Sequence, residues 1–170
     1  MTETVKRENR LALVLTLLSF LAAAVTFLGS AVWPYRAVWQ LIAIATVTLG
    51  IQLTQKYLLP TYEYRLEEGD DPHESSPHVT VIQHQGQRNK TLCHLALTAC
   101  QVLPYCPRKE LTARYGEIAY RYSFCVDLRP KQSFYVLLGF REEKAALRLQ
   151  CSQAFADALT EAAKRAGNDF

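Results

Sequence analysis

The chain has 170 residues, of which 49% are hydrophobic, and a formal net charge of +3. This length suits one modest domain with an accessory segment. Residues 61–170 are balanced, with 14 Lys and Arg against 14 Asp and Glu, and they show no basic stripe with interleaved aromatic residues, so the composition argues against nucleic-acid binding.

Two long apolar runs occupy the N-terminal third. Residues 11–32 contain no charge, and residues 37–53 are also uncharged and can extend to about residue 57 if Lys56 reaches the headgroups. Roughly 20 apolar residues in a helix cross a ~30 Å hydrocarbon core. Because only Trp33–Arg36 separates the runs, we expect residues 1–60 to form a membrane hairpin with spans at about 11–32 and 37–57. Its predicted interface anchors are Trp33, Tyr35, Trp39 and Tyr57.

Two other interpretations of these runs were weighed. Two buried helices of a soluble core would each show a polar face, which neither run has. A cleaved signal peptide would fit the basic residues before the first run and the small residues at 29–31. The first run is longer than the ~7–15 apolar residues of a signal sequence, and a second run follows it at once, so we expect retention in the membrane.

Basic residues predict the orientation of the hairpin. They lie before the first run (Lys6, Arg7, Arg10) and after the second (Lys56, Arg65), whereas the tip has only Arg36. The positive-inside rule then places both termini in the cytoplasm of a two-pass cell-membrane protein. The five cysteines are odd in number and form no CxxC pair, which fits a reducing compartment.

Small residues recur every four positions in both runs. Such residues let helices approach closely. They either pack the hairpin together, which is the interpretation we favour, or mediate a helix-based oligomer. The two stripes are Ala22, Thr26 and Ser30 in the first run and Thr46, Gly50 and Thr54 in the second.

Beyond residue 60 the pattern changes to alternation typical of strands. We expect strands at 62–66, 78–85, 91–98, 118–126, 133–140 and 145–151, with turns at 67–77, 86–90, 128–131 and 141–144. The polar segment 107–116 is a loop or a short helix. Ser152 can cap a final helix at 152–166 that Gly167 ends. Residues 61–170 are therefore predicted to form a mainly antiparallel β-domain, a pleckstrin-homology-like (PH-like) barrel or sandwich closed by one C-terminal helix.

Two segments carry a resemblance to a family. The runs GQRNKTLCHLAL (86–97) and YRYSFCVDLRPKQSFYVLL (120–138) resemble small two-helix membrane proteins of clostridial-type bacteria, which are uncharacterised and have a PH-like cytoplasmic domain. The resemblance implies this architecture and brings no catalytic residues. The chain departs from lipid-binding PH domains, which have basic residues in the loop after the first strand. Here that loop is acidic and would repel phosphoinositide headgroups; its acids are Glu67, Glu68, Asp70, Asp71 and Glu74.

The stretch TLCHLALTACQVLPYC (91–106) raises the question of a metal or thiol site. Alternation places Cys93 on the core face opposite Val79 and Val81, and places His94, with Leu92, on the other face, where His84 lies diagonally across the hairpin. Zinc needs three or four ligands, which this pattern does not assemble. We therefore expect no metal and no cofactor.

The remaining thiols offer an enzymatic alternative. Cys106 precedes two basic residues, and Cys151 precedes the final helix, so either could be a reactive thiol. Cys151 continues the apolar face of its strand and is expected to be buried. No nucleophile elbow, phosphate-binding glycine loop or HExxH motif is present.

The sequence thus predicts a non-catalytic module that presents a cytoplasmic PH-like domain to a protein partner or to the membrane surface. The alternatives are a membrane-tethered thiol enzyme or redox sensor, and an accessory subunit of a transporter. The candidate binding residues are cations of predicted loops: Arg88, Lys90, Arg108, Lys109 and Arg129.

Overall fold

The computed structural model describes residues 1–8, 10–68, 76–140 and 143–166. The chain forms two compact units. The β unit contains Met1–Lys6, Thr61–Val126 and Pro130–Phe170, and the helical unit contains Arg7–Pro60 and Asp127–Arg129.

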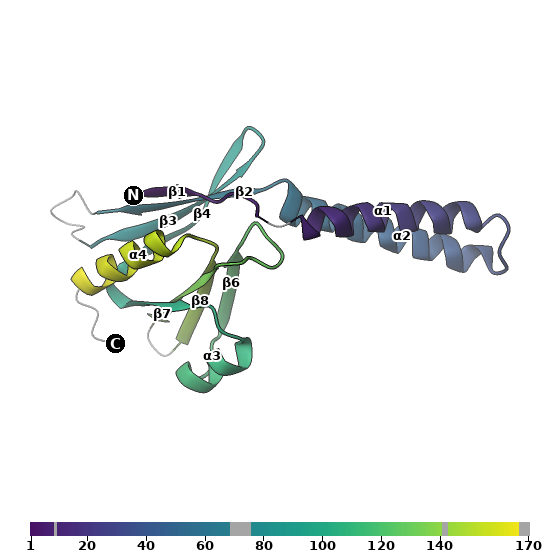
Figure 1. Ribbon diagram of the computed structural model, residues 1–170. Coiled ribbons are helices and arrows are strands. Elements are labelled where there is room, and N and C mark those ends of the chain that lie inside the picture. The colour runs from purple at the N-terminus through teal and green to yellow at the C-terminus, as the bar shows by residue number, and fades with distance from the viewer. Residues whose placement is uncertain (9, 69–75, 141–142, 167–170) are drawn as a thin grey trace. The chain divides into compact units, whose positions relative to one another are not determined.

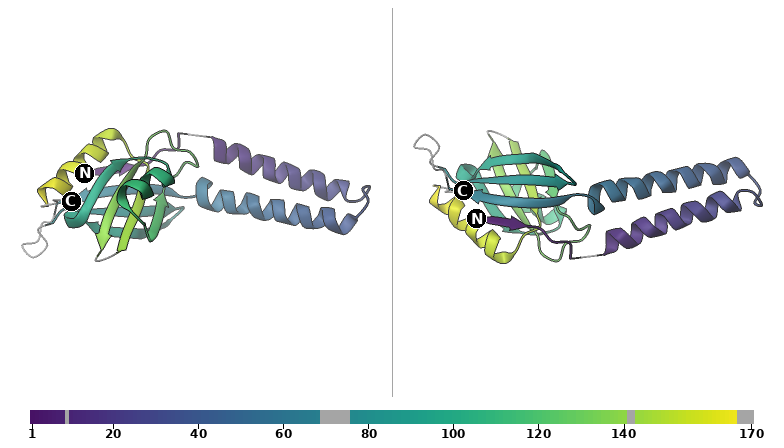
Figure 2. Two further views of the ribbon diagram at one scale, coloured as in Figure 1. Left: turned by 90° about the horizontal axis from the view of Figure 1, so that it is seen from below. Right: turned by 90° about the horizontal axis from the view of Figure 1, so that it is seen from above.

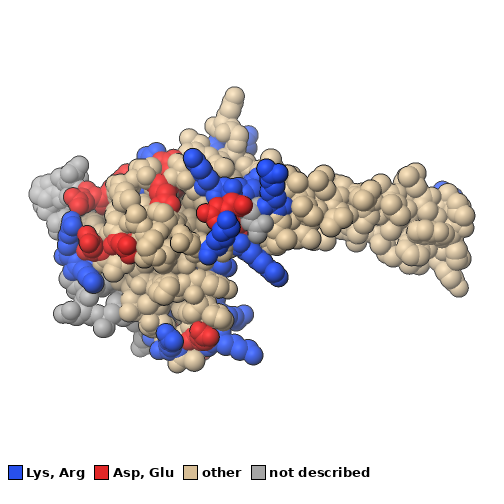
Figure 3. All heavy atoms as spheres, viewed as in Figure 1, with Lys and Arg blue, Asp and Glu red and all other residues tan. Residues whose placement is uncertain are grey.

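The helical unit is a pair of helices, α1 (Leu11–Gly29) and α2 (Arg36–Leu53), of which α2 continues into a short π-helix, η1 (Thr54–Leu58). Both helices are long and apolar enough to cross a membrane. Charged side chains are almost absent from their surface except near the two ends, as Figure 3 shows. The predicted pair of apolar helices is therefore present, with a turn at residues 30–35 that is longer than expected.

Small residues bring the two helices together. A Cβ atom added to Gly50 would lie 3.1 Å from the Phe20 ring, so glycine permits the close approach. Ser30 is buried as well, whereas Ala22 of the predicted stripe is exposed. The other small buried residues of the pair are Ala12, Thr16, Ala23 and Ala43. Most large apolar side chains of the pair point away from it.

Aromatic residues lie at both ends of the helix pair, where anchors were predicted. At the turn, the Trp33 and Trp39 ring centroids are 4.6 Å apart, and Trp39 Nε1 donates to the Pro34 carbonyl oxygen at 3.1 Å. Tyr35 is 81% exposed there. At the other end, the Lys56 ammonium lies 5.4 Å from the centre of the Tyr57 ring.

Sheet A of the β unit is antiparallel throughout and has the order β1-β2-β3-β4 (Figures 1 and 2). Its strands are β1 (Thr2–Thr4), β2 (Thr61–Glu67), β3 (His78–Gln85) and β4 (Arg88–Ala96). The sequence analysis predicted three of them, and the turn between β3 and β4 is shorter than predicted because β4 begins at Arg88. Gly86 has φ 61°, which favours glycine at this tight turn.

Strand β1 was not predicted, because it is only three residues long and precedes the first apolar helix. Thr2 pairs with Arg65 and Thr4 pairs with Glu63. The Val5 N–H donates to the Tyr62 carbonyl oxygen at 2.9 Å, and the Val5 side chain is buried. Residues 1–6 therefore belong with the β unit and not, as the predicted boundary at residue 60 had it, with the hairpin.

Sheet B has the order β5-β7-β8-β6. It contains β5 (Cys100–Pro104), β6 (Tyr120–Phe124), β7 (Phe134–Phe140) and β8 (Glu143–Leu149), and a 3-10 turn, η2 (Leu97–Ala99), leads into it from β4. Strand β5 was not predicted as a separate strand. Strand β6 pairs with β8 in parallel, so the sheet is mixed. The chain reaches this arrangement because β7 and β8 form an antiparallel hairpin and β6 is added to its far edge.

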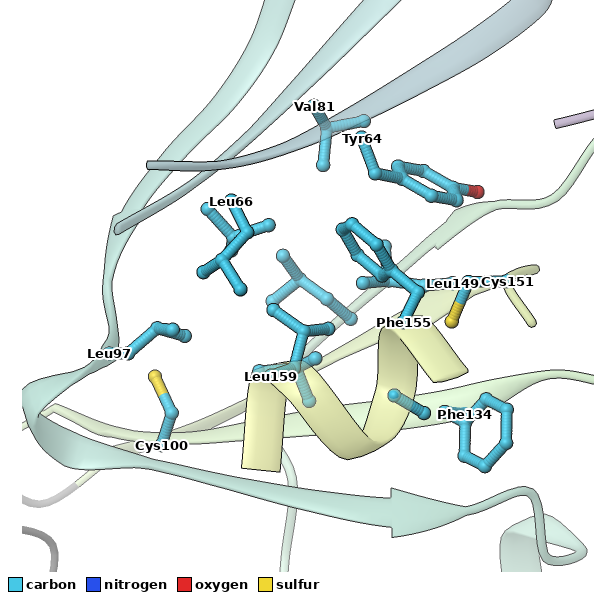
Figure 4. Close-up of a cluster of buried hydrophobic side chains, with 14 of the residues drawn as sticks. Tyr64, Leu66, Val81, Leu97, Cys100, Phe134, Leu149, Cys151, Phe155 and Leu159 are labelled. Carbon is cyan, nitrogen blue, oxygen red and sulfur yellow. The ribbon is translucent and has the colours of Figure 1, made fainter. Parts of the chain in front are cut away.

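Helix α4 (Gln153–Arg165) closes the space between the two sheets, as Figure 4 shows. Its Phe155 and Leu159 side chains are fully buried between residues of sheet A, such as Tyr64, and residues of sheet B, such as Leu149. Ser152 caps the helix by accepting from the Phe155 N–H at 3.3 Å, as predicted. Gly167, the predicted stop, lies outside the described residues, as do Asp70, Asp71, Glu74 and part of the 141–144 turn.

Candidate functional site

The cysteine-rich stretch 91–106 is a strand, a turn and a second strand. Cys93 pairs with Val81 and Leu95 pairs with Val79, as the alternation predicted. A β-bulge near Val81 and Ile82 leaves Leu92 as an extra residue of β4. Leu92 consequently packs against the core beside Cys93. The expectation that Leu92 lies on the face opposite to Cys93 was wrong, because strict alternation does not allow for the extra residue of a β-bulge.

The histidines of this hairpin do not form one site. His94 Nδ1 lies 2.9 Å from Thr80 Oγ1, and its ring contacts that of His78 in a tilted arrangement, with centroids 4.5 Å apart and an angle of 56° between the planes. His84 instead contacts Asn89 and Glu63, at 2.7 Å each. The predicted diagonal pair of His84 and His94 is replaced by His78 and His94, which the strand register brings together. Within the described parts of the chain, no group of three or more His, Cys, Asp or Glu residues is placed to hold a metal ion.

The thiols of the two enzymatic candidates differ in environment. Cys151 is 4% exposed, and burial, with a smaller contribution from the Glu3 carboxylate, raises its pKa to about 12. Cys106 is half-buried, and it packs on the face of sheet B opposite to the face that contacts α4. None of the five cysteines is in a disulfide. Cys151 thus lacks the low pKa that a nucleophilic thiol needs.

A pocket of about 720 Å³ lies between helix α3 (Arg108–Tyr115) and strand β6, on the outer face of sheet B. We call it the cationic pocket. Three of its side chains are cations, Arg108, Lys109 and Arg121, and one, Glu117, is an acid. Its other lining residues are Thr112, Ala113 and Ile118. Figure 3 shows basic residues on both sides of a small acidic patch over α3.

A small apolar cluster fixes α3 on the sheet. Leu111 is 1% exposed and packs with Leu137, Ala146 and Ile118. The predicted alternatives for segment 107–116, a loop or a short helix, are thereby resolved as a helix. Gly116, with φ 81°, ends the helix in a conformation that favours glycine. Burial of Leu111 turns Arg108 and Thr112, one helical turn apart, towards β6.

A chain of hydrogen bonds connects the two elements that form the pocket. The Thr112 hydroxyl donates to the Arg108 carbonyl oxygen at 3.0 Å. The Thr112 hydroxyl oxygen in turn accepts from Nη2 of Arg121 at 3.1 Å. One nitrogen of the Arg121 guanidinium is therefore fixed by α3, while no described residue accepts from its Nε or Nη1. The group is oriented and has donors left for a ligand.

The cations of the pocket form no ion pair with the part of the chain that the structure describes. No described carboxylate lies within 4.0 Å of the charged nitrogens of Arg108, Lys109 or Arg121. Other arginines of the β unit do form ion pairs, for example Arg65 with Glu63 at 2.6 Å. Three cations against one carboxylate give the pocket a formal charge of +2, in a domain whose Lys and Arg equal its Asp and Glu.

The structure brings together two of the five predicted binding residues. Arg108 and Lys109 line the cationic pocket, whereas Arg88 and Lys90 are exposed at the start of β4. Arg129 belongs to the helical unit. Arg121 was not among the predicted binding residues. The aromatic and apolar residues of the 118–126 strand indicated one face of that strand, and Arg121 is one of the residues that alternate with them. A positive charge between two tyrosines on an edge strand was the available signal.

Comparison of the chain with family models, with curated proteins and with solved structures found no match.

Proposed function

We propose that this chain is a two-span membrane protein whose β unit is a cytoplasmic, PH-like, non-catalytic module that binds an acidic partner through the cationic pocket. The observation that carries the binding role is a set of three cations in one pocket that pair with no described carboxylate: Arg108, Lys109 and Arg121. The family resemblance to small two-helix clostridial-type membrane proteins is part of the same proposal.

The lipid-facing character of the helix pair supports membrane insertion. Large apolar side chains such as Leu28, 72% exposed, and Leu41, 66% exposed, point away from the partner helix. Exposed apolar surface of this extent is costly in water and favourable in lipid. Trp33, Tyr35 and Trp39 at one end and Tyr57 at the other would then lie at the two headgroup layers.

Strand pairing supports an even number of crossings. Strand β1 precedes α1 and strand β2 follows α2, yet the two are hydrogen-bonded neighbours in sheet A. This pairing supports our placing the segments before and after the helices on the same side of the membrane. The basic residues that flank the helices, including Arg7 and Lys56, support the cytoplasm as that side.

The same pairing supports retention of the N-terminal segment. Cleavage after the first helix would remove β1 and the buried Val5 from the β unit.

Two packed sheets and a capping helix support the PH-like description. The parallel pairing of β6 with β8 departs from it. The pKa of Cys151, near 12, speaks against a thiol enzyme that uses this residue.

The test is purification of the full chain from its own membranes in mild detergent, with mass spectrometry of stoichiometric companions. We compare the triple charge reversal R108E/K109E/R121E with a matched control, R88E/K90E/K131E, which changes the net charge equally at exposed positions outside the pocket. A partner lost only from the first variant supports the proposal. If both variants retain the partner, the proposal that the cationic pocket binds it is refuted. If no partner accompanies the unmodified chain, the binding role itself is refuted.

Orientation is tested separately by protease digestion from each side of the membrane. We expect the β unit to be cleaved in inverted vesicles and protected in intact spheroplasts. Cleavage in spheroplasts would place the β unit outside the cell and contradict the cytoplasmic assignment.

A further inference from the structure

The charge of the cationic pocket indicates the chemical class of its ligand. The pocket has a formal charge of +2 from Arg108, Lys109, Arg121 and Glu117. A carboxylate ligand carries one negative charge, whereas a phosphate monoester carries about −1.5 to −2 at neutral pH. The phosphate matches the pocket charge, and its three terminal oxygens can accept from several donors at once.

The donors fit the same chemistry. Arg121 presents a planar guanidinium, and Thr112 accepts only one of the two Nη2 hydrogens, so the second Nη2 hydrogen and the hydrogens of Nε and Nη1 remain. Neighbouring donors of a guanidinium match two oxygens of a phosphate. Lys109 adds a compact ammonium, which binds phosphate as a point charge. Arg108, on the same face of α3 as Thr112, adds a second guanidinium.

The alternative role of these cations, plain solvated surface charge, does not account for their grouping. Like charges that share a pocket repel one another. Elsewhere in the described β unit, Arg65 and Arg165 each have an acidic partner. Here Glu117 lines the pocket without forming an ion pair. A bound dianion would remove the repulsion.

We propose that the cationic pocket binds a phosphate group, held by Arg121 with Arg108 and Lys109 supplying further charge. This inference rests on the proposed binding function and names the chemistry of its ligand. The phosphate belongs either to a soluble phosphorylated compound or to a phospholipid headgroup, and both present the same oxygens.

The test measures acetylation of Lys109 in the full chain by a small amine-reactive reagent, quantified by mass spectrometry. Lys90, exposed and outside the pocket, is the internal control. In one arm the chain is in detergent without phospholipid, and inorganic phosphate or glycerol 3-phosphate replaces chloride at constant ionic strength. In the other arm it is in phosphatidylcholine nanodiscs, with or without phosphatidic acid.

We expect phosphate to slow acetylation of Lys109 several-fold and to leave Lys90 unchanged. Protection in detergent identifies a soluble phosphate ligand, and protection only in nanodiscs with phosphatidic acid identifies a headgroup. In R121Q the phosphate concentration needed for protection should rise about tenfold or more, because a charge-assisted hydrogen bond to the ligand is lost. The K131Q variant should behave as the unmodified chain.

Equal protection of Lys109 and Lys90, or protection of neither in both arms, would overturn the proposal. So would unchanged protection in R121Q. The co-purification experiment separates this failure from that of the proposed function. If the partner still depends on the pocket while phosphate gives no protection, the pocket binds an acidic protein surface and not phosphate.

Discussion

The most direct chemical test of the structure is alkylation of Cys151 by a maleimide. The thiol lies where β8 passes into α4, and it is 4% exposed. Burial raises its pKa to about 12 from the ordinary 9.0, since the charged thiolate loses its hydration. The same residue is the candidate nucleophile of the alternative in which the chain is a thiol enzyme.

The expected rate follows from the fraction of thiolate, which is the species that reacts. At pH 7.5 a thiol of pKa 9.0 is about 3% ionised, whereas one of pKa about 12 is about 0.003% ionised. Ionisation alone therefore slows direct attack about 1000-fold, and restricted access slows it further. Direct attack on Cys151 should still accelerate about tenfold between pH 9 and pH 10, while a thiol of pKa 9.0 gains less than twofold.

The assay uses the unmodified full chain, because replacing buried cysteines would itself perturb the core. The chain in detergent receives a short maleimide pulse, and peptide mass spectrometry gives the modified fraction of each cysteine. Cys106, half-buried, is the internal comparison. A second pulse in denaturant shows that all five cysteines can react.

We expect Cys106 to be modified well before Cys151 in the folded chain. Modification of Cys151 at the same rate as Cys106 at pH 7.5, in protein that remains folded, would refute the burial and restore the thiol-enzyme alternative. Such a result would mean that α4 does not cover the Cys151 thiol in the folded chain.

Three substitutions test the packing of the β unit, each by thermal unfolding in detergent with exposure of buried thiols as the signal. V5A should cost about 1.5–3 kcal/mol, because two buried methyl groups leave the core, while the exposed T4A should change little. Y64F should cost about 1–3 kcal/mol, since the hydroxyl donates to the Phe124 carbonyl oxygen at 2.5 Å and accepts from the Gln150 N–H at 3.2 Å; unchanged stability would show that these bonds are not formed. S152A should cost about 1 kcal/mol through loss of the cap of α4, and a higher melting temperature would contradict that role.

Regular patterns were the part of the fold that the sequence could predict. The two apolar runs became α1 and α2, and the helical spacing of Phe155, Leu159 and Ala162 became α4 with Ser152 as its cap. Alternation found β2, β3 and β4, and the pairing of Cys93 with Val81. Each of these signals is local, because it is set by which face of a single element is buried.

Features that depend on contacts between distant segments escaped prediction. Strand β1 is too short for a periodic signal and exists because β2, some 60 residues away, offers it an edge. The parallel partner of β6 follows from the edge left by the β7–β8 hairpin. Arg121 joins the cationic pocket only because Leu111 fixes α3 beside that strand. The residue pattern within one helix or strand does not contain these contacts between distant segments.

Strand β1 also sets an order of events during synthesis. Thr2 leaves the ribosome first, but its partner Arg65 is made 63 residues later, after both helices. At ~5–20 residues per second the N-terminal segment waits roughly 3–13 s for that partner. Both helices are made during this interval, and Val5 is without its buried site until the interval ends. Closing β1 onto β2 is therefore a late step. In the proposed two-span membrane protein it can occur only when both ends of the helix pair are in the same compartment, so sheet A would act as a check on correct insertion.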